Sequence, residues 1–169
     1  MVAERENIEV VRVGERNTNK FLTFNLGEEE YGLEILKVRE IIGLMHITRV
    51  PRMPDFVRGV INLRGKVIPV IDLRLKFGMS ANEDTEETCI IVVDLDDKLM
   101  GALVDRVSEV LDIPDDDISE TPDFGVSVDT RFIQGMGRIE ERVVMVLDIG
   151  GILTSEEIYR IASLGEEGD

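Results

Sequence analysis

Short apolar runs alternate with turn-forming residues along most of this chain. Four runs are clearest, and each is six to eight residues long and rich in β-branched side chains. Runs of this kind, bounded by Gly, Asp and Asn, are typical of β-strands. They cover residues 21–26, 66–73, 89–95 and 142–149. No stretch in the middle of the chain has a helical period over ten or more residues, which argues against a βαβ fold.

The two ends of the chain have a different pattern. Residues 1–19 are mostly polar and predict a polar N-terminal tail. Residues 155–162 begin with Ser155, a favourable N-cap, and space their apolar side chains three and four apart, which predicts a short helix near the C-terminus. Residues 161–169 carry several carboxylates and predict an acidic C-terminal end.

An internal repeat relates the two halves of the chain. A shift of 69 residues places Gly32 on Gly101, and a shift of 76 residues places Gly59 on Gly135. Most other matches are apolar, so the repeat reports shared packing. A unit of this length is too long for a solenoid and suits two similar small β-barrels. The approximate repeats are residues 21–73 and 90–149, and the pattern does not specify how the barrels exchange strands.

Composition narrows the class of protein. The chain has 169 residues, 43% of them hydrophobic, which is enough for one domain or two small fused ones. Its formal net charge of −16 disfavours binding to nucleic acid or to an anionic membrane surface. The single cysteine excludes an internal disulfide, and no signal peptide or membrane span is present, so we expect an intracellular protein.

Catalytic chemistry is sparse in the sequence. His46 is the only histidine and has apolar neighbours, which favours a structural role, and Cys89 opens an apolar strand. Residues 59–67 differ from a phosphate-binding loop in glycine spacing, in the missing hydroxyl and in the strand that follows. The acidic runs 94–97 and 115–117 lack the pattern of a calcium loop and are interpreted as solvated turns, with weak divalent-cation binding as the alternative. We therefore expect no catalytic residue, metal or cofactor.

Two segments differ from the apolar strand runs described above, because charged residues and glycines are interspersed among their apolar residues. Residues 31–41 and 53–74 strongly resemble the two signature stretches of the CheW family of chemotaxis coupling proteins, and the resemblance extends over residues 20–160. It implies an all-β fold of two five-stranded SH3-like β-barrels around a shared hydrophobic core, with short helices. It also implies a single CheW-like domain over residues 20–160, built from two barrel subdomains.

The resemblance also implies a function. Members of the family are non-enzymatic scaffolds that bind the regulatory domain of the chemotaxis histidine kinase and the cytoplasmic tip of methyl-accepting chemoreceptors. We accordingly expect a cytoplasmic adaptor, recruited to membrane receptor arrays, with no nucleic-acid partner and no direct membrane insertion. The alternatives are an adaptor of a non-flagellar signalling array, which would share the same motifs, and a small-molecule-binding or enzymatic β-barrel.

The resemblance places receptor-binding residues in both signature segments. It carries this role onto Val38, Glu40 and Arg64, and Asn62 and Leu63 lie on the same turn and could join the surface. Val38 could equally belong to the core, since its repeat counterpart is also a valine.

The repeat helps to separate packing from function among these residues. Arg64 falls on Glu140, so an arginine that one half lacks is better explained by a specific contact than by shared packing. Glu40 is expected to pair with it. Gly59 and Gly65 flank this arginine and are predicted to be structural turn glycines, the second of them shaping the backbone around Arg64.

Overall fold

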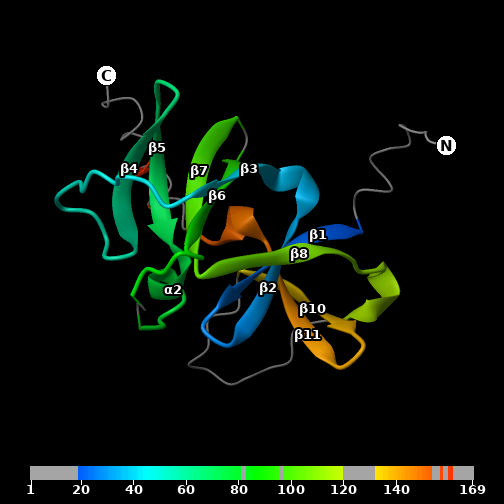
Figure 1. Cartoon of the computed structure of the whole chain (residues 1–169). Coiled ribbons are helices and arrows are strands. Elements are labelled where there is room, and N and C mark those ends of the chain that lie inside the picture. The colour runs from blue at the N-terminus through cyan, green and yellow to red at the C-terminus, as the bar shows by residue number, and fades with distance from the viewer. Residues whose placement is uncertain are drawn as a thin grey trace.

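The computed structural model describes residues 19–80, 83–95, 97–119 and 132–153, together with residues 157, 160 and 161. These residues form two β-sheets joined by short helical turns (Figure 1), which confirms the all-β prediction. Of the predicted C-terminal helix, Glu157, Arg160 and Ile161 are helical. The rest of that helix, residues 1–18 of the predicted N-terminal tail and residues 162–169 lie outside the described residues.

The first barrel is the sheet with the strand order β8-β1-β2-β11-β10-β9, which has six strands and not the expected five, because the two-residue β9 also pairs with β10. All its neighbours pair antiparallel except β11 and β2, which run parallel through Val146 opposite Gly32. Its strands are β1 (Lys20–Leu26), β2 (Glu29–Glu34), β8 (Arg106–Asp112), β9 (Ile118–Ser119), β10 (Ile133–Ile139) and β11 (Arg142–Leu147).

The second barrel is the sheet with the order β3-β6-β7-β5-β4. It also has one parallel pair, β5 with β7, in which Val70 lies opposite Gly101. Its strands are β3 (Val38–Gly43), β4 (Val57–Leu63), β5 (Lys66–Asp72), β6 (Cys89–Leu95) and β7 (Lys98–Val104). Short helical segments follow four of the strands: η1 (Ile35–Lys37), α2 (Leu73–Lys76), η2 (Asp115–Asp117) and η3 (Ile149–Gly151).

Each barrel is assembled from both repeats. The first takes β1 and β2 from the first repeat and β8, β9, β10 and β11 from the second. The second barrel takes the complementary set, so the parallel pairs β11–β2 and β5–β7 occupy equivalent places. A repeat is therefore not a barrel, because the chain crosses between the sheets after β2 and again after β7.

The hydrophobic core continues from one barrel into the other. A single cluster of buried side chains joins Phe24 and Leu33 of the first sheet to Ile71 and Ile91 of the second. An aromatic row reinforces this contact: Phe24 stacks on Tyr31, Tyr31 packs on Phe77 beyond α2, and Phe77 stacks on Phe132. The shared core predicted from the family resemblance is thus confirmed.

None of the helices among the described residues is both long and apolar enough to cross a membrane.

Candidate functional site

The predicted site lies where the second barrel closes on itself. β3 and β4 stand at opposite ends of the sheet order, and the turn that follows β4 carries Arg64. Arg64 donates to the carboxylate of Glu40 on β3, with its Nη1 3.4 Å from Oε2 and its Nη2 in closer contact with Oε1. A backbone bridge between Thr48 and Val60 joins the same two ends of the barrel. The ion pair expected from the sequence is confirmed and spans this seam.

The two charges differ in exposure. The side chain of Arg64 is 68% exposed, whereas that of Glu40 is 34% exposed. An ion pair this open to water contributes about 0–1 kcal/mol to stability. The guanidinium therefore remains accessible to a partner, and a partner that excludes water would strengthen the local electrostatics.

The turn that presents Arg64 has a defined backbone. Arg64 has φ 52° and Gly65 has φ 90°, both in the left-handed region that a tight two-residue hairpin turn requires. Gly65 N donates to Oδ1 of Asn62 at 2.9 Å, which fixes the turn from the preceding strand. At the equivalent turn of the first barrel, Glu140 has φ 56°. Since glutamate and arginine adopt the same conformation there, the backbone does not require arginine.

The apolar residues of the predicted set are half-buried. Val38 begins β3 and packs against the core cluster shared by the barrels. Leu63 packs against the separate cluster around Ile61 and Ile68. Both side chains therefore support the strands that carry Glu40 and Arg64. Of the five predicted contact residues, Asn62 and Arg64 are exposed, and Glu40 is half-buried.

Gly59 lies inside β4 and not in a turn, which corrects the predicted location of this glycine. Its φ is 142°, and a Cβ there would lie 2.0 Å from the carbonyl oxygen of Thr48. Its counterpart Gly135 is in a similar position, because a Cβ would lie 2.9 Å from the carbonyl oxygen of Ser119. The two matched glycines are therefore explained by a close approach of two backbones at a strand bulge. The sequence alone had suggested a turn at Gly59.

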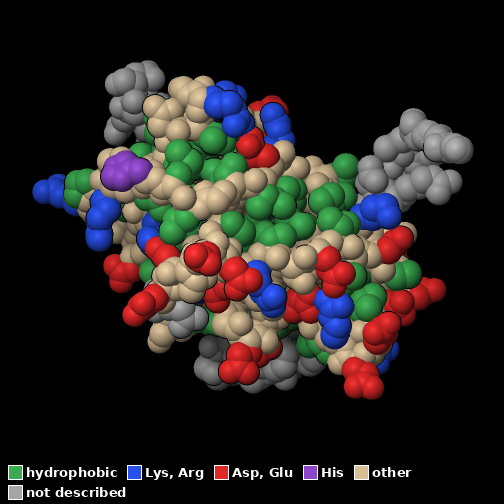
Figure 2. Space-filling view, viewed as in Figure 1, with side chains coloured by type: hydrophobic (Ala, Val, Ile, Leu, Met, Phe, Trp, Pro, Cys, Tyr) green, Lys and Arg blue, Asp and Glu red, His purple; other side chains and the backbone are tan. Residues whose placement is uncertain are grey.

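An apolar strip beside the ion pair was missed by the sequence analysis. Three of its side chains are strongly exposed: Leu36 at 58%, Ile41 at 45% and Val110 at 51%. Figure 2 shows apolar side chains gathered over β3 and η1 and continuing toward β8, across both barrels. Ile41 and Val110 are repeat counterparts at a shift of 69, on the edge strands β3 and β8. Each is followed by a second apolar residue, Ile42 or Leu111, which is less exposed in the structure, so the local pattern did not mark which of the two faces solvent.

A buried charge network anchors the end of β5. The side chain of Arg74 is 1% exposed and donates to both carboxylate oxygens of Asp72, each at 3.0 Å. It also donates to Asp105 at 2.9 Å, where the chain passes from β7 to β8. The hydrogen bond to Asp72 raises the pKa of Arg74 above its already high value, so the guanidinium stays charged. Asp105 in turn accepts from Gly27 N of the β1–β2 turn, which links the two barrels.

The described residues show no arrangement for metal or nucleophilic chemistry. No group of three or more His, Cys, Asp or Glu side chains within the described ranges could hold a metal ion. Cys89 is half-buried at the start of β6, and burial raises the pKa of its thiol, which lowers the fraction of reactive thiolate. His46 is exposed on the connection between β3 and β4.

Comparison of the sequence with known proteins finds the same family in each case. The sequence profile of the CheW-like domain matches residues 20–157. The Chemotaxis protein CheW of Klebsiella aerogenes is 43% identical over 153 residues, which cover 90% of this chain and 92% of that protein. The Chemotaxis protein CheW of Rhizobium meliloti is 38% identical over 138 residues, covering 82% of this chain and 89% of that protein.

The fold leads to the same group. The crystal structure of the scaffolding protein CheW from Thermoanaerobacter tengcongensis superimposes with a TM-score of 0.76 at 34% sequence identity. The superposition covers 83% of this chain and 95% of that one. Sequence and structure therefore agree over both barrels.

Proposed function

The chain belongs to the CheW-like domain family and is a chemotaxis coupling adaptor, and on that premise we propose that it holds the regulatory domain of the chemotaxis histidine kinase beside the cytoplasmic tip of methyl-accepting chemoreceptors. It does so without catalysing a reaction. Joining two weak contacts through one rigid body raises the effective concentration of the kinase near the receptor. The shared core of the two barrels supplies that rigidity.

The receptor docks on the edge strand β3 and the neighbouring β4–β5 turn. Arg64 and Glu40 supply the charged part of this surface, and Ile41 supplies an exposed apolar side chain on the same edge. The apolar surface runs on toward β8 (Figure 2), the strand on which Val110 is exposed, and this extent and mixed character suit an amphipathic helix. Val38 and Leu63 position these side chains from the half-buried face, and Asn62 and Gly65 hold the turn.

The observation that carries the proposal is the exposed guanidinium of Arg64 beside an apolar strip. The equivalent turn in the first barrel has Glu140 with nearly the same φ, so packing does not account for arginine at this position. A change of Arg64 to glutamate should therefore reduce receptor binding without unfolding the protein.

The test is co-sedimentation of the full chain with a receptor tip fragment and with the kinase regulatory domain, each alone and then together. We expect Arg64→Glu and Ile41→Asp each to weaken receptor binding by about tenfold or more, with kinase binding retained. Arg138→Glu is the matched control, because Arg138 is an exposed arginine on β10 of the other barrel. Melting temperature is measured for all variants.

Three outcomes would contradict the proposal. Loss of folding together with loss of binding would make Arg64 structural. An equal loss in the Arg138→Glu control would attribute the effect to net charge. Failure of the wild-type chain to bind either fragment, with stabilisation by a small metabolite, would favour a ligand-binding β-barrel. Binding to the receptors and kinase of a non-flagellar pathway would leave the proposed scaffolding role intact and change only the process that the pathway controls.

A further inference from the structure

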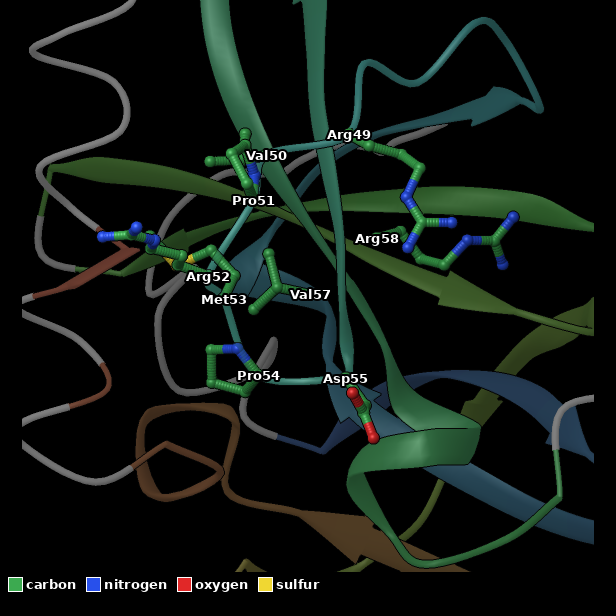
Figure 3. Close-up of a pocket in the computed structure, with 9 residues that line it drawn as sticks. All are labelled: Arg49, Val50, Pro51, Arg52, Met53, Pro54, Asp55, Val57 and Arg58. Carbon is green, nitrogen blue, oxygen red and sulfur yellow. The ribbon is translucent and has the colours of Figure 1, made fainter.

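A basic hollow lies on the connection between β3 and β4 of the second barrel. Its volume is about 360 Å³, and Figure 3 shows the side chains around it. Three arginines contribute to its wall: Arg49, Arg52 and Arg58. The whole chain has a formal net charge of −16, so three arginines within one short segment form an unusually basic region.

Two of these arginines are available to a ligand. Arg49 and Arg52 are exposed, and neither has an acidic side chain within 4.0 Å among the residues that the structure describes. Arg58 is different, because Asp72 and Asp84 each accept from it at 3.2 Å. The one carboxylate in the wall, Asp55, lies beside α2 and points away from the arginines (Figure 3). Within the part of the chain that the structure describes, the hollow therefore presents two arginines, Arg49 and Arg52, without an acidic partner.

The backbone of the hollow is held in shape. At its start, Thr48 exchanges two hydrogen bonds of 2.8 Å with Val60, and at its end Val57 N donates to the carbonyl of Pro54 at 2.9 Å. Arg52 has φ 66°, a left-handed conformation that is costly for arginine. Its carbonyl oxygen accepts from Nη2 of Arg160 at 2.5 Å, which contributes to holding the loop in that conformation. Because the loop is already ordered, less conformational entropy of the protein is lost when a ligand binds.

The corresponding connection of the first barrel has the opposite charge. Between β8 and β10, the described residues 113–119 include Asp115, Asp116 and Asp117 and contain no lysine or arginine. The Thr48–Val60 bridge has its own counterpart there in Ser119 opposite Met136. Because the two connections share their backbone pairing and differ in charge, barrel closure does not require the arginines.

We propose that this hollow binds an extended acidic segment of a partner protein. Figure 3 shows Arg49 and Arg58 extending on one side of the hollow and Arg52 on the opposite side, so no single small anion contacts all three. An extended chain with carboxylates flanking an apolar residue matches this spacing. Its apolar residue packs on Pro51 and Val57, and its carboxylates meet Arg49 and Arg52 with charge-assisted, bidentate hydrogen bonds.

The test is a titration of the isotope-labelled full chain, followed by NMR. The probe is the peptide acetyl-Gly-Glu-Glu-Leu-Glu-Glu-Gly-amide, and its neutral control carries glutamine in place of each glutamate. We expect the acidic peptide to shift amide signals of residues 48–58 and its affinity to fall as salt is raised. The neutral peptide should leave those signals unchanged.

Two matched variants distinguish binding at the hollow from a general effect of the protein's net charge. In R49E/R52E, both arginines are replaced by anions, and we expect peptide binding to weaken by about tenfold or more. The control K98E/R138E makes the same change in net charge at two exposed positions outside the hollow and should bind within about twofold of wild type. Should R49E/R52E unfold, R49A/R52G removes both charges while glycine accepts the left-handed backbone at position 52.

The proposal is overturned by any of three results. Equal losses in R49E/R52E and K98E/R138E would show that only net charge matters. Peptide-induced shifts confined to signals outside residues 48–58 would place the contact elsewhere. Inorganic phosphate that shifts the same amides and displaces the peptide at equal concentration would identify a small anion as the occupant. None of these results depends on receptor binding at Arg64.

Discussion

The ends of β5 and β11 are repeat counterparts that use the same turn in different ways. Asp72 accepts from the backbone N of Arg74 at 3.0 Å, and Asp148 accepts from Gly150 N at 3.2 Å, so each aspartate caps the helical turn that follows its strand. Asp72, however, is fully buried and paired with arginine, whereas Asp148 is exposed. Both barrels therefore have the aspartate cap, but only in the second barrel is the aspartate buried and paired with an arginine.

The difference shows how a duplicated fold becomes asymmetric. In the first barrel, the residue that corresponds to Arg74 is Gly150, so the capping aspartate has no side-chain cation at that position. In the second, Arg74 extends from the end of β5 to Asp105, and Asp105 holds the β1–β2 turn through Gly27. The second barrel therefore carries the polar contacts that fix one barrel against the other.

The largest effect is expected from breaking the buried network. Arg74→Met removes the principal partner of the buried Asp72 carboxylate and should lower the free energy of unfolding by about 3–5 kcal/mol. Asp148→Ala removes only an exposed cap and should cost about 0.5–1 kcal/mol. Urea unfolding followed by circular dichroism measures both. Similar losses for the two variants would mean that burial of the charge does not distinguish the barrels.

The second comparison concerns glycines that the repeat aligns. Gly59→Ala drives a Cβ to 2.0 Å from the Thr48 carbonyl and should cost about 2–3 kcal/mol. Gly135→Ala meets Ser119 O at 2.9 Å and should cost less.

Gly65→Ala is the control for backbone strain alone. Gly65 has φ 90° with no atom within 4 Å of the added Cβ, so the expected cost is about 1 kcal/mol. Denaturant midpoints order the three variants. A larger loss at Gly65 than at Gly59 would contradict the account of close backbone approach.

A pH experiment tests the shared aromatic row. Burial, with a smaller effect of Glu29, raises the pKa of Tyr31 above its ordinary value. The folded state then retains the phenolic proton when the unfolded chain has lost it, so stability falls as the pH rises above about 10. Tyr31→Phe should flatten this alkaline loss, measured as the unfolding free energy against pH. Cys89→Ala is the necessary control, because burial raises the pKa of that thiol too.

The smallest effects are expected at the two exposed arginines with positive φ. Arg64→Glu should change the unfolding free energy by less than about 1 kcal/mol, since glutamate occupies the equivalent turn at Glu140. Arg52→Gly should be neutral or stabilising by up to about 1 kcal/mol, because glycine relieves the left-handed strain. Thermal melts check both. A loss above about 2 kcal/mol in either would show a structural role for the arginine.

Four of the strands, the internal repeat and the family resemblance could be inferred from the amino-acid sequence. Alternation of β-branched residues with turn formers located β1, β5, β6 and β11, because local propensity and side-chain period act over a few residues. The mismatch between Arg64 and Glu140 marked the turn worth testing. These properties follow from the order of residues and do not require knowledge of which strands pair.

The sharing of strands between the barrels and the burial of particular charges depend on long-range contacts. Exchange of strands between the repeats depends on long-range pairing, which no local pattern encodes. The same holds for the backbone approach at Gly59, the burial of Arg74 and the exposure of Ile41. Each results from residues far apart in the sequence meeting in space, and it is these meetings that place an apolar strip and an arginine on one edge of the second barrel.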